Sequence, residues 1–321
     1  MTTAGRAMVC MEVAGGNVAF EGGLSLPGLD AWVITRPHRG AASGGDVHFL
    51  SSCATGRITR LLLADVSGHG EGVGRTSAAL RDIMRRNVNF VDQDRVVRAL
   101  NAEFAGVAGG RFATAIVGTY WEPTARLTLA NAGHPRPLLR RRGEAGWSAV
   151  SVEGGEAIGA ERRGRRGRRA REVRARDGLT DLPLGIEAGA AYRQVSVRLG
   201  RGDSLLLYTD ALVEAGAASG GQIGEAGFVE LLGGRDAGDA SAFLRGLLAD
   251  VEARGGGALD DDATAILLRR SESRASYVAG LGAPVRIARS VIGEGPAGWP
   301  QMRVDNILGT ALPWLNGKRE E

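Results

Sequence analysis

The sequence predicts an α+β fold in which mainly antiparallel sheets pack face to face as a sandwich. Short apolar runs typical of strands recur along most of the chain, and two successive helical segments interrupt them once. One further helix comes just before the last strand. The strict alternation of strand and helix that marks a doubly wound parallel sheet is absent.

Three strands are predicted before the first helix, at residues 31–35, 47–52 and 58–65. Pro37 breaks the chain after the first of them. The third is an almost continuous apolar run, which is typical of a strand covered on both faces. It ends on Asp65, a carboxylate at the point where the chain leaves the core.

Two helices are predicted next. Past Gly74, apolar side chains recur at helical spacing as far as Met84. Asp94 is expected to cap a second helix that runs to about Val107. The apolar side of that helix carries Val96, Val97, Leu100 and Phe104.

Strands resume after these helices, with Pro123-Thr124 as a turn signal between the first two. They are expected at residues 113–120, 126–131, 195–199, 204–209 and 263–268, with another beginning near Arg136. A helix over residues 240–253 comes before the final strand, and Gly255-Gly256-Gly257 ends it.

The length of the chain limits the number of domains that it can form. With 321 residues and 44% hydrophobic content, the chain can form one large domain or two small ones. We expect a single domain over residues 31–270. Residues 1–30 are expected to form an N-terminal extension with an edge hairpin of the same domain, and residues 271–321 a C-terminal extension.

The net charge of +4 hides an uneven distribution. Residues 161–176 hold nine Arg and two Glu, a local charge of +7, so the remaining chain carries −3. This Arg-rich insert has no apolar periodicity and is expected to be a solvated loop. Overall charge therefore does not favour nucleic-acid binding, although specific anion binding by the insert stays open.

Membrane insertion and export are not expected. No apolar run approaches the roughly 18 residues of a membrane span, and the N-terminal residues lack the pattern of a signal peptide. Cys10 and Cys53 make neither a disulfide framework nor a zinc site. A reduced, cytoplasmic location is the expectation.

Five short motifs, mostly acidic, carry the functional signal, and four of them place an aspartate at the end of an apolar run. Such carboxylates repel each other when they converge, unless a cation lies between them, and hard oxygen ligands suit Mg²⁺ or Mn²⁺. In chain order the motifs are Gly44-Gly45-Asp46, Asp65-Val66-Ser67-Gly68-His69-Gly70, Asn131-Ala132-Gly133-His134-Pro135, Tyr208-Thr209-Asp210 and Asp260-Asp261-Asp262-Ala263-Thr264.

The motifs differ in how strongly they indicate a functional site. Asp65 and Asp210 end buried strands, where a carboxylate is costly unless it is paired or binds a metal. Among residues 260–262, side chains alternate across a strand, so one or two can face a site. His69 is a metal ligand, a general acid or a polar loop residue, and His134 is expected to shape its loop.

Taken in order, these motifs together with Leu182-Pro183-Leu184-Gly185-Ile186 resemble the SpoIIE/RsbU-like branch of the metal-dependent type-2C serine/threonine phosphatases. The resemblance covers about residues 31–270 and implies a four-layer α-β-β-α sandwich with a two-metal site between the sheets. It departs from the family pattern at Ala211 and at Val47-His48.

Site roles follow from the resemblance. It implies that Asp65 bridges two Mn²⁺ or Mg²⁺ ions and that Val66 adds its backbone carbonyl. Asp46, Asp210 and Asp261 complete the ligand set. His69 or a metal-bound water donates the proton to the leaving serine oxygen.

The expected function is hydrolysis of phosphoserine or phosphothreonine on a regulatory protein by a water that the two metals activate. The resemblance implies a bacterial signalling role, with an anti-anti-sigma-type regulator in sigma-factor partner switching as the substrate. Two alternatives stay open: a pseudophosphatase that binds without turnover, and an anion- or nucleic-acid-binding module acting through the Arg-rich insert. The oligomeric state is also open, a homodimer included.

Overall fold

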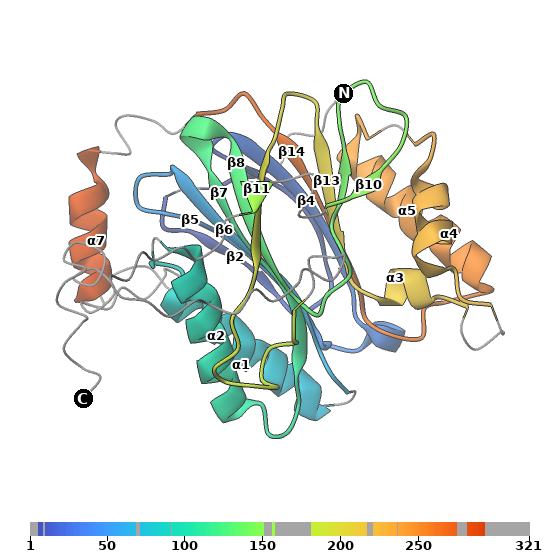
Figure 1. Ribbon diagram of the computed structural model, residues 1–321, viewed down its shortest axis with the longest axis horizontal. Coiled ribbons are helices and arrows are strands. Elements are labelled where there is room, and N and C mark those ends of the chain that lie inside the picture. The colour runs from blue at the N-terminus through green and yellow to red at the C-terminus, as the bar shows by residue number, and fades with distance from the viewer. Residues whose placement is uncertain are drawn as a thin grey trace, which may run out of the picture.

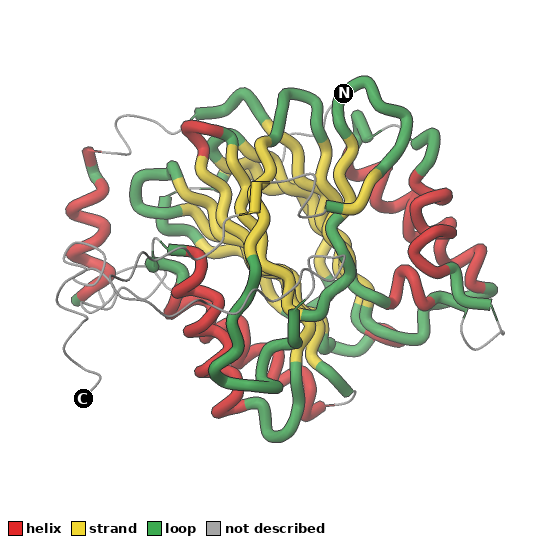
Figure 2. The backbone as a smooth tube through the Cα atoms, viewed as in Figure 1, coloured by secondary structure: helices red, strands yellow, loops and turns green. Residues whose placement is uncertain are grey.

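Two seven-stranded sheets pack face to face, and helices cover both outer faces (Figure 1). The computed structural model describes residues 6–8, 10–68, 71–90, 92–150, 156–157, 181–216, 221–235, 237–274 and 281–292. Helices on either side of the strands are clear in the tube view (Figure 2). The predicted four-layer α-β-β-α sandwich is confirmed.

The first sheet, called sheet I, is antiparallel throughout, with the strand order β11-β12-β8-β7-β6-β5-β2. Strand β6, which lies between β7 and β5, is an unbroken apolar strand that is buried along nearly its whole length, as the sequence predicts. Its strands are β2 (Val13–Gly16), β5 (Asp46–Ser52), β6 (Ile58–Val66), β7 (Ala113–Trp121), β8 (Arg126–Ala132), β11 (Glu156–Ala157) and β12 (Gln194–Arg198).

The second sheet, called sheet II, has the order β1-β3-β4-β14-β13-β9-β10. Only the short pairing of β1 with β3 is parallel among the described strands. Its strands are β1 (Arg6–Ala7), β3 (Phe20–Leu26), β4 (Leu29–Arg36), β9 (Leu138–Arg140), β10 (Ser148–Ala149), β13 (Ser204–Tyr208) and β14 (Ala263–Arg270).

Each helical layer closes a separate apolar core. Helices α1 (Glu71–Asn87) and α2 (Gln93–Val107) cover sheet I, whereas α3 (Ala211–Glu214), α4 (Gly224–Leu232) and α5 (Ala240–Gly255) cover sheet II. A third core, mostly aliphatic, fills the space between the sheets. Burial on both faces explains why the central strands are continuous apolar runs.

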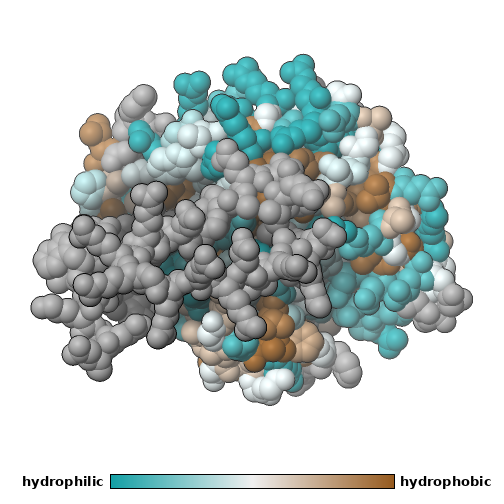
Figure 3. All heavy atoms as spheres, in the orientation of Figure 1, coloured by the Kyte–Doolittle hydropathy of each residue, from teal (hydrophilic) through white to brown (hydrophobic). Residues whose placement is uncertain are grey.

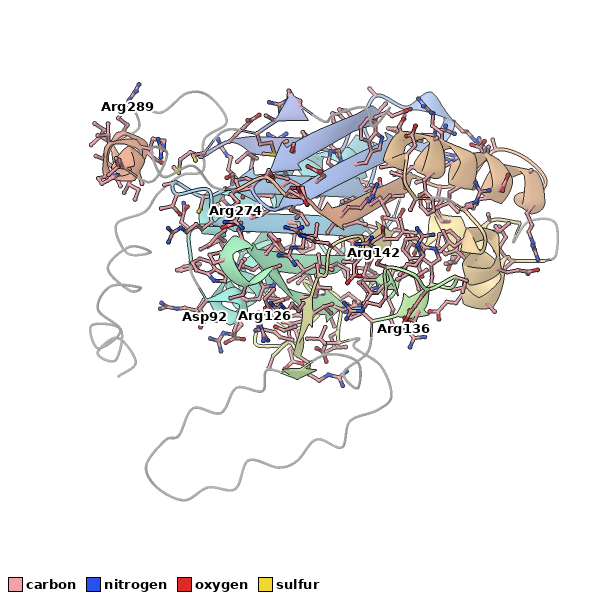
Figure 4. The ribbon with its side chains drawn as sticks, turned by 90° about the horizontal axis from the view of Figure 1, so that it is seen from above. Asp92, Arg126, Arg136, Arg142, Arg274 and Arg289 are labelled. Carbon is pink, nitrogen blue, oxygen red and sulfur yellow. The ribbon has the colours of Figure 1, made fainter. Side chains whose placement is uncertain are left out.

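One helix lies outside this sandwich. Helix α7 (Ala283–Val291) stands apart from the sheets in Figure 1 and in the perpendicular view, where Arg289 is labelled on it (Figure 4). Its first turn contacts the body: Ala283 packs with Met11 and Ala54, and an Arg286 guanidinium nitrogen donates to the Ala54 carbonyl at 2.6 Å.

Three local predictions need correction. Asp92 caps α2 instead of Asp94, because the Asp92 carboxylate already accepts the Asp94 backbone N–H at 3.0 Å. The hairpin expected within residues 1–30 extends past residue 30, because β3 pairs with β4 over residues 20–36 in sheet II, while β2 pairs with β5 in sheet I. The strand expected near Arg136 begins at Leu138, after Pro137, which has no N–H to donate.

Candidate metal centre

Sheet I supplies the deepest carboxylates. Asp46 begins β5 and Asp65 lies near the end of the neighbouring β6, where the two are directly paired across the strands. Like charges placed opposite each other in a sheet repel. Asp46 is 1% exposed, so water cannot screen that repulsion at its carboxylate.

Sheet II brings two further acids to the same place. Asp210 comes two residues after β13, and Asp261 comes two residues before β14. Because β13 and β14 are antiparallel neighbours, with Tyr208 opposite Ala265, these two chain ends meet at one edge of the sheet. The Thr209 hydroxyl donates to Asp46 Oδ2 at 3.0 Å and thereby joins this edge to the Asp46 end of sheet I.

The electrostatics of Asp65 show that these acids share one space. Burial raises the pKa of Asp65 to about 7, and the charges of Asp210, Asp261, Asp262 and Glu214 add to this shift. All of these neighbouring charges are negative. A carboxylate held in such surroundings is neutralised by a proton or by a cation.

The other carboxylates respond in the same way. Burial, then the charge of Asp65, raises the pKa of Asp46 well above its ordinary value, although the hydroxyls of Thr264 and Thr209 oppose the shift. Burial and the charges of Glu214 and Asp261 raise the pKa of Asp210. The centre therefore carries more negative charge than its own hydrogen bonds compensate.

Asp262 has a different task from Asp261. Its carboxylate accepts the backbone N–H of His38 at 2.7 Å and that of Gly45 at 2.5 Å, and so fastens the loop in front of β5 to the start of β14. Asp261 is exposed, and its side chain accepts only the Asp262 N–H at 2.8 Å among the bonds of the described residues. This division of tasks agrees with the choice of Asp261 as the candidate ligand.

Gly45 leaves a space that the proposed ligand oxygens occupy. A Cβ added there would lie 2.9 Å from the Val66 carbonyl oxygen and 3.2 Å from Asp65 Oδ1. Val73 closes the same space at 3.1 Å. The Val66 carbonyl and the Asp65 carboxylate therefore converge on one point beside Asp46.

Exchange of Gly45 for alanine tests this geometry. In Gly45→Ala the new methyl group must displace the Val66 carbonyl or the Asp65 carboxylate, and we expect Mn²⁺ affinity to fall by about 10-fold or more. Isothermal titration of the purified protein with MnCl₂ measures the change. Gly106→Ala is the matched control, because a Cβ at Gly106 meets no atom within 4 Å. Equal Mn²⁺ affinity in both variants would contradict the geometry.

The loop that carries Gly44 and Gly45 is held from two sides. The Asn17 side-chain amide donates to the Gly44 carbonyl at 3.2 Å and to the Gly74 carbonyl at 2.9 Å. The Ser77 hydroxyl, on α1, lies 2.8 Å from the Gly45 carbonyl. These bonds tie the loop before Asp46 to α1, the helix that follows the Asp65 loop.

The histidines divide into structural residues and one that the structure does not describe. Asn131 and His134 close their own turn, since the His134 N–H donates to Asn131 Oδ1 and the Asn131 amide donates to the His134 carbonyl, both at 2.8 Å. Burial lowers the pKa of His134 to about 3, so it is neutral and shapes the loop, as expected. His69, the predicted proton donor, lies outside the described residues, as does the Arg-rich insert.

The residues fit a hard divalent cation by their chemistry. Asp46 Oδ1 is buried and accepts no hydrogen bond from the described residues, an expensive arrangement unless a cation lies there. The acids that act on Asp65 come from both sheets, and oxygen is the donor that Mg²⁺ and Mn²⁺ prefer. Within the described residues, no group of three or more Asp, Glu, His or Cys side chains is already arranged to hold an ion. Mutual repulsion is a sufficient reason for that spacing.

Sequence reasoning overlooked three contributors. Thr209 and Thr264 lie inside quoted motifs but were given no role, although both hydroxyls act on Asp46. Glu214 acts on Asp65 and Asp210 from the end of α3. Its position four residues after Asp210, one helical turn away, was a usable signal.

Comparison with known proteins agrees with this description. The profile of the Stage II sporulation protein E (SpoIIE) family matches residues 55–271. No curated protein sequence matches the chain. Among solved structures, the RsbU and RsbW domains of a Mycobacterium tuberculosis protein match with 23% identity and a TM-score of 0.56, covering 83% of this chain and 63% of that one.

Two further structures have the same fold. The PP2C phosphatase domain of Bacillus subtilis SpoIIE, with a fragment of its regulatory domain, shows 14% identity and a TM-score of 0.56, covering 82% of this chain and 64% of that one. RsbX in complex with magnesium shows 16% identity and a TM-score of 0.53, covering 78% of this chain and all of that one. The chain thus spans less than two thirds of the first two structures.

The fold is that of the PP2C-type phosphatase structures. Within that class, the chain belongs to the SpoIIE family, whose profile covers more than half of its length.

Proposed function

We propose that this chain is a metal-dependent phosphatase that hydrolyses phosphoserine or phosphothreonine on a regulatory protein. The observation that carries the proposal is the convergence of Asp46 and Asp65 from sheet I with Asp210 and Asp261 from sheet II. A surplus of buried negative charge favours the binding of divalent cations. Bound cations in turn favour the binding of a phosphoryl group. Membership of the SpoIIE family supports the same reaction.

The carboxylates of Asp46, Asp65, Asp210 and Asp261, with the Val66 carbonyl, would hold two Mn²⁺ or Mg²⁺ ions. When bound, such ions supply an activated water and neutralise charge on the phosphoryl oxygens. The protein's own contribution is to hold the ligand residues in position. Asp262 and Asn17 fasten the loop in front of Asp46, and burial keeps bulk water away from its carboxylate.

Proton transfer to the leaving serine oxygen needs a donor. His48 and His134 are poor candidates, because burial, aided at His48 by the charge of Arg81, lowers their pKa values to about 4 and about 3. Both rings are also committed to hydrogen bonds with threonine hydroxyls. His69 or a metal-bound water stays the proposed donor.

Apolar side chains beside the centre support a protein substrate. Phe112, whose backbone N–H donates to Ser67 Oγ at 3.1 Å, is 38% exposed. Leu182 and Ile186, in the segment that pairs with the start of β7, are 46% and 53% exposed. Hydrophobic surface is visible at the lower edge of the molecule, near the loop between α2 and β7 (Figure 3). Exposed apolar groups at such a rim suit contact with another protein.

Regulatory phosphoproteins of partner-switching systems are the substrate class we propose. One similar structure contains an RsbU domain together with an RsbW domain, and another similar protein is SpoIIE, described as a cell-fate determinant. No helix within the described residues is both long and apolar enough to cross a membrane.

The test is Mn²⁺-dependent hydrolysis of p-nitrophenyl phosphate. The purified chain should release p-nitrophenol with MnCl₂ present and stop when EDTA is added, and excess MnCl₂ should restore the rate. Mn²⁺ binding without hydrolysis of this compound or of a phosphoserine peptide would identify a pseudophosphatase and overturn the proposal.

A further inference from the structure

A row of buried hydroxyl groups leads from His48 to the carboxylate of Asp46. Its members lie on four strand segments: Thr35 on β4, His48 on β5, Thr209 just after β13 and Thr264 on β14. Each of these side chains is at most 3% exposed. Most polar groups at such depth form hydrogen bonds.

The contacts are continuous. His48 Nδ1 lies 3.1 Å from Thr35 Oγ1, and Thr35 Oγ1 lies 3.3 Å from Thr264 Oγ1. The Thr264 backbone N–H donates to Thr209 Oγ1 at 3.0 Å. The Thr209 hydroxyl then donates to Asp46 Oδ2 at 3.0 Å.

The hydrogen bond that Thr209 accepts orients its hydroxyl group. Since its oxygen accepts the Thr264 N–H, its own hydrogen is directed away from that bond, and Asp46 Oδ2 at 3.0 Å is a nearer acceptor for it than the Thr264 carbonyl at 3.4 Å. The backbone around it is fixed as well, because the Thr209 N–H donates to the Thr264 carbonyl at 3.0 Å. The hydroxyl is therefore held by the pairing of two strands of sheet II.

These contacts leave the two carboxylate oxygens of Asp46 in different surroundings. Oδ2 is occupied by the Thr209 hydroxyl, whereas Oδ1 is buried without any hydrogen-bond partner. A carboxylate held at one oxygen and bare at the other presents the bare one in a fixed direction. Bonds of this kind orient metal-binding carboxylates and tune their affinity.

We infer that Thr209 and Thr264 are positioning residues for cation binding by Asp46, with Thr35 and His48 fixing Thr264 from behind. The inference rests on the proposed metal centre. It assigns a task to the threonines of the Tyr208-Thr209-Asp210 and Asp261-Asp262-Ala263-Thr264 motifs, which the ligand set leaves unexplained. It also gives His48, where the chain departs from the family pattern, a structural place behind the centre.

The test compares Thr209→Val with Thr209→Ser. Valine keeps the branched shape and removes the hydroxyl, whereas serine keeps the hydroxyl. Titration calorimetry with MnCl₂ should show affinity reduced by about 10- to 100-fold in the valine variant. The serine variant should stay within about 3-fold of wild type, since the donor to Asp46 is retained.

Thr59→Val is the matched control. Thr59 lies on β6, is 1% exposed, and its hydroxyl has no hydrogen-bond partner, so the same exchange removes nothing that acts on Asp46. Its Mn²⁺ affinity should equal that of wild type. If Thr209→Val fails to fold, Thr264→Val gives a second measurement, again with a loss expected.

The outcomes are separable from those of the proposed function. Weaker Mn²⁺ binding in the valine variant alone supports the inference, even if no variant hydrolyses p-nitrophenyl phosphate. Unchanged binding in both Thr209→Val and Thr264→Val would overturn it while leaving the phosphatase activity intact. Absence of Mn²⁺ binding by the wild-type protein would overturn it together with the metal centre.

Discussion

Asp65→Asn is expected to abolish hydrolysis of p-nitrophenyl phosphate while the protein stays folded. The exchange keeps the size of the side chain and removes the charge at the point where Asp210 and Asp261 act together. We expect a loss on the order of 10³-fold, the upper end of what removal of one electrostatic stabiliser costs. Initial rates at saturating MnCl₂ measure the loss, and far-UV circular dichroism reports the fold.

The same variant should also lose its response to metal. A ligand that binds only the native state raises the melting temperature in proportion to its affinity and concentration. Wild type should therefore melt at a higher temperature in MnCl₂ than in EDTA, and Asp65→Asn should show little difference. Asp82→Asn is the control, because it removes an equal charge from a side chain that is 49% exposed on α1. Wild-type rates in Asp65→Asn would remove the basis of the catalytic assignment.

Without metal, Asp65 should destabilise the native protein increasingly as pH rises. Its pKa is raised from 3.8 to about 7 on folding, so the native state binds more protons than the unfolded state between these values. The free energy of unfolding then falls as pH increases through this window. The penalty is absent below about pH 4, where Asp65 is protonated in both states, and complete above about pH 7.

The measurement is a difference between wild type and Asp65→Asn. Urea unfolding in EDTA at several pH values between 4 and 8 should show wild type losing stability relative to the variant as pH rises. Subtraction matters because His48 and His134 act in the opposite direction: burial lowers their pKa values, so their contributions increase with pH. Both histidines are present in each protein, and their effects cancel.

Addition of MnCl₂ should reverse the trend for wild type. Metal ligands must be deprotonated to bind, so the stabilisation by Mn²⁺ should grow from pH 5 to pH 8. Asp65→Asn should show a much smaller gain. A wild-type stability that is parallel to that of the variant at every pH in EDTA would show that Asp65 is not held among other negative charges.

Much of the fold was predictable because buried strands and helices have recognisable patterns of apolar residues in the sequence. Residues 58–65 have the pattern of a strand covered on both faces, and β6 lies inside sheet I with helices on one side and sheet II on the other. The helix at residues 240–253 was equally clear, since α5 places Phe243, Leu244, Leu247 and Leu248 on the core. Long, periodic segments of this kind carry their own signal.

The pairing between strands could not be predicted from such patterns. Residues 13–16 and 20–26 are neighbours in sequence, yet they lie in different sheets, because the first segment pairs with β5 and the second with β4. Glycine-rich strands with few large side chains specify register weakly. Short helices such as α3 and α4 were missed for a related reason: each is held by a few side chains, Leu212 of α3 and Phe228 of α4, that pack in the same core as Tyr208, and neither has a long apolar pattern of its own.

The sequence by itself determined which residues carry the chemistry: aspartates at the ends of apolar strands, in an order typical of one family. The tertiary structure decided what each of them does. Only the folded structure distinguishes Asp261, which is exposed, from Asp262, whose carboxylate fastens the Gly45 loop. Only the stacking of the sheets sets the Thr209 hydroxyl against Asp46. A strand end can be inferred from local composition, whereas a hydrogen bond between residues 163 positions apart depends on how whole layers meet.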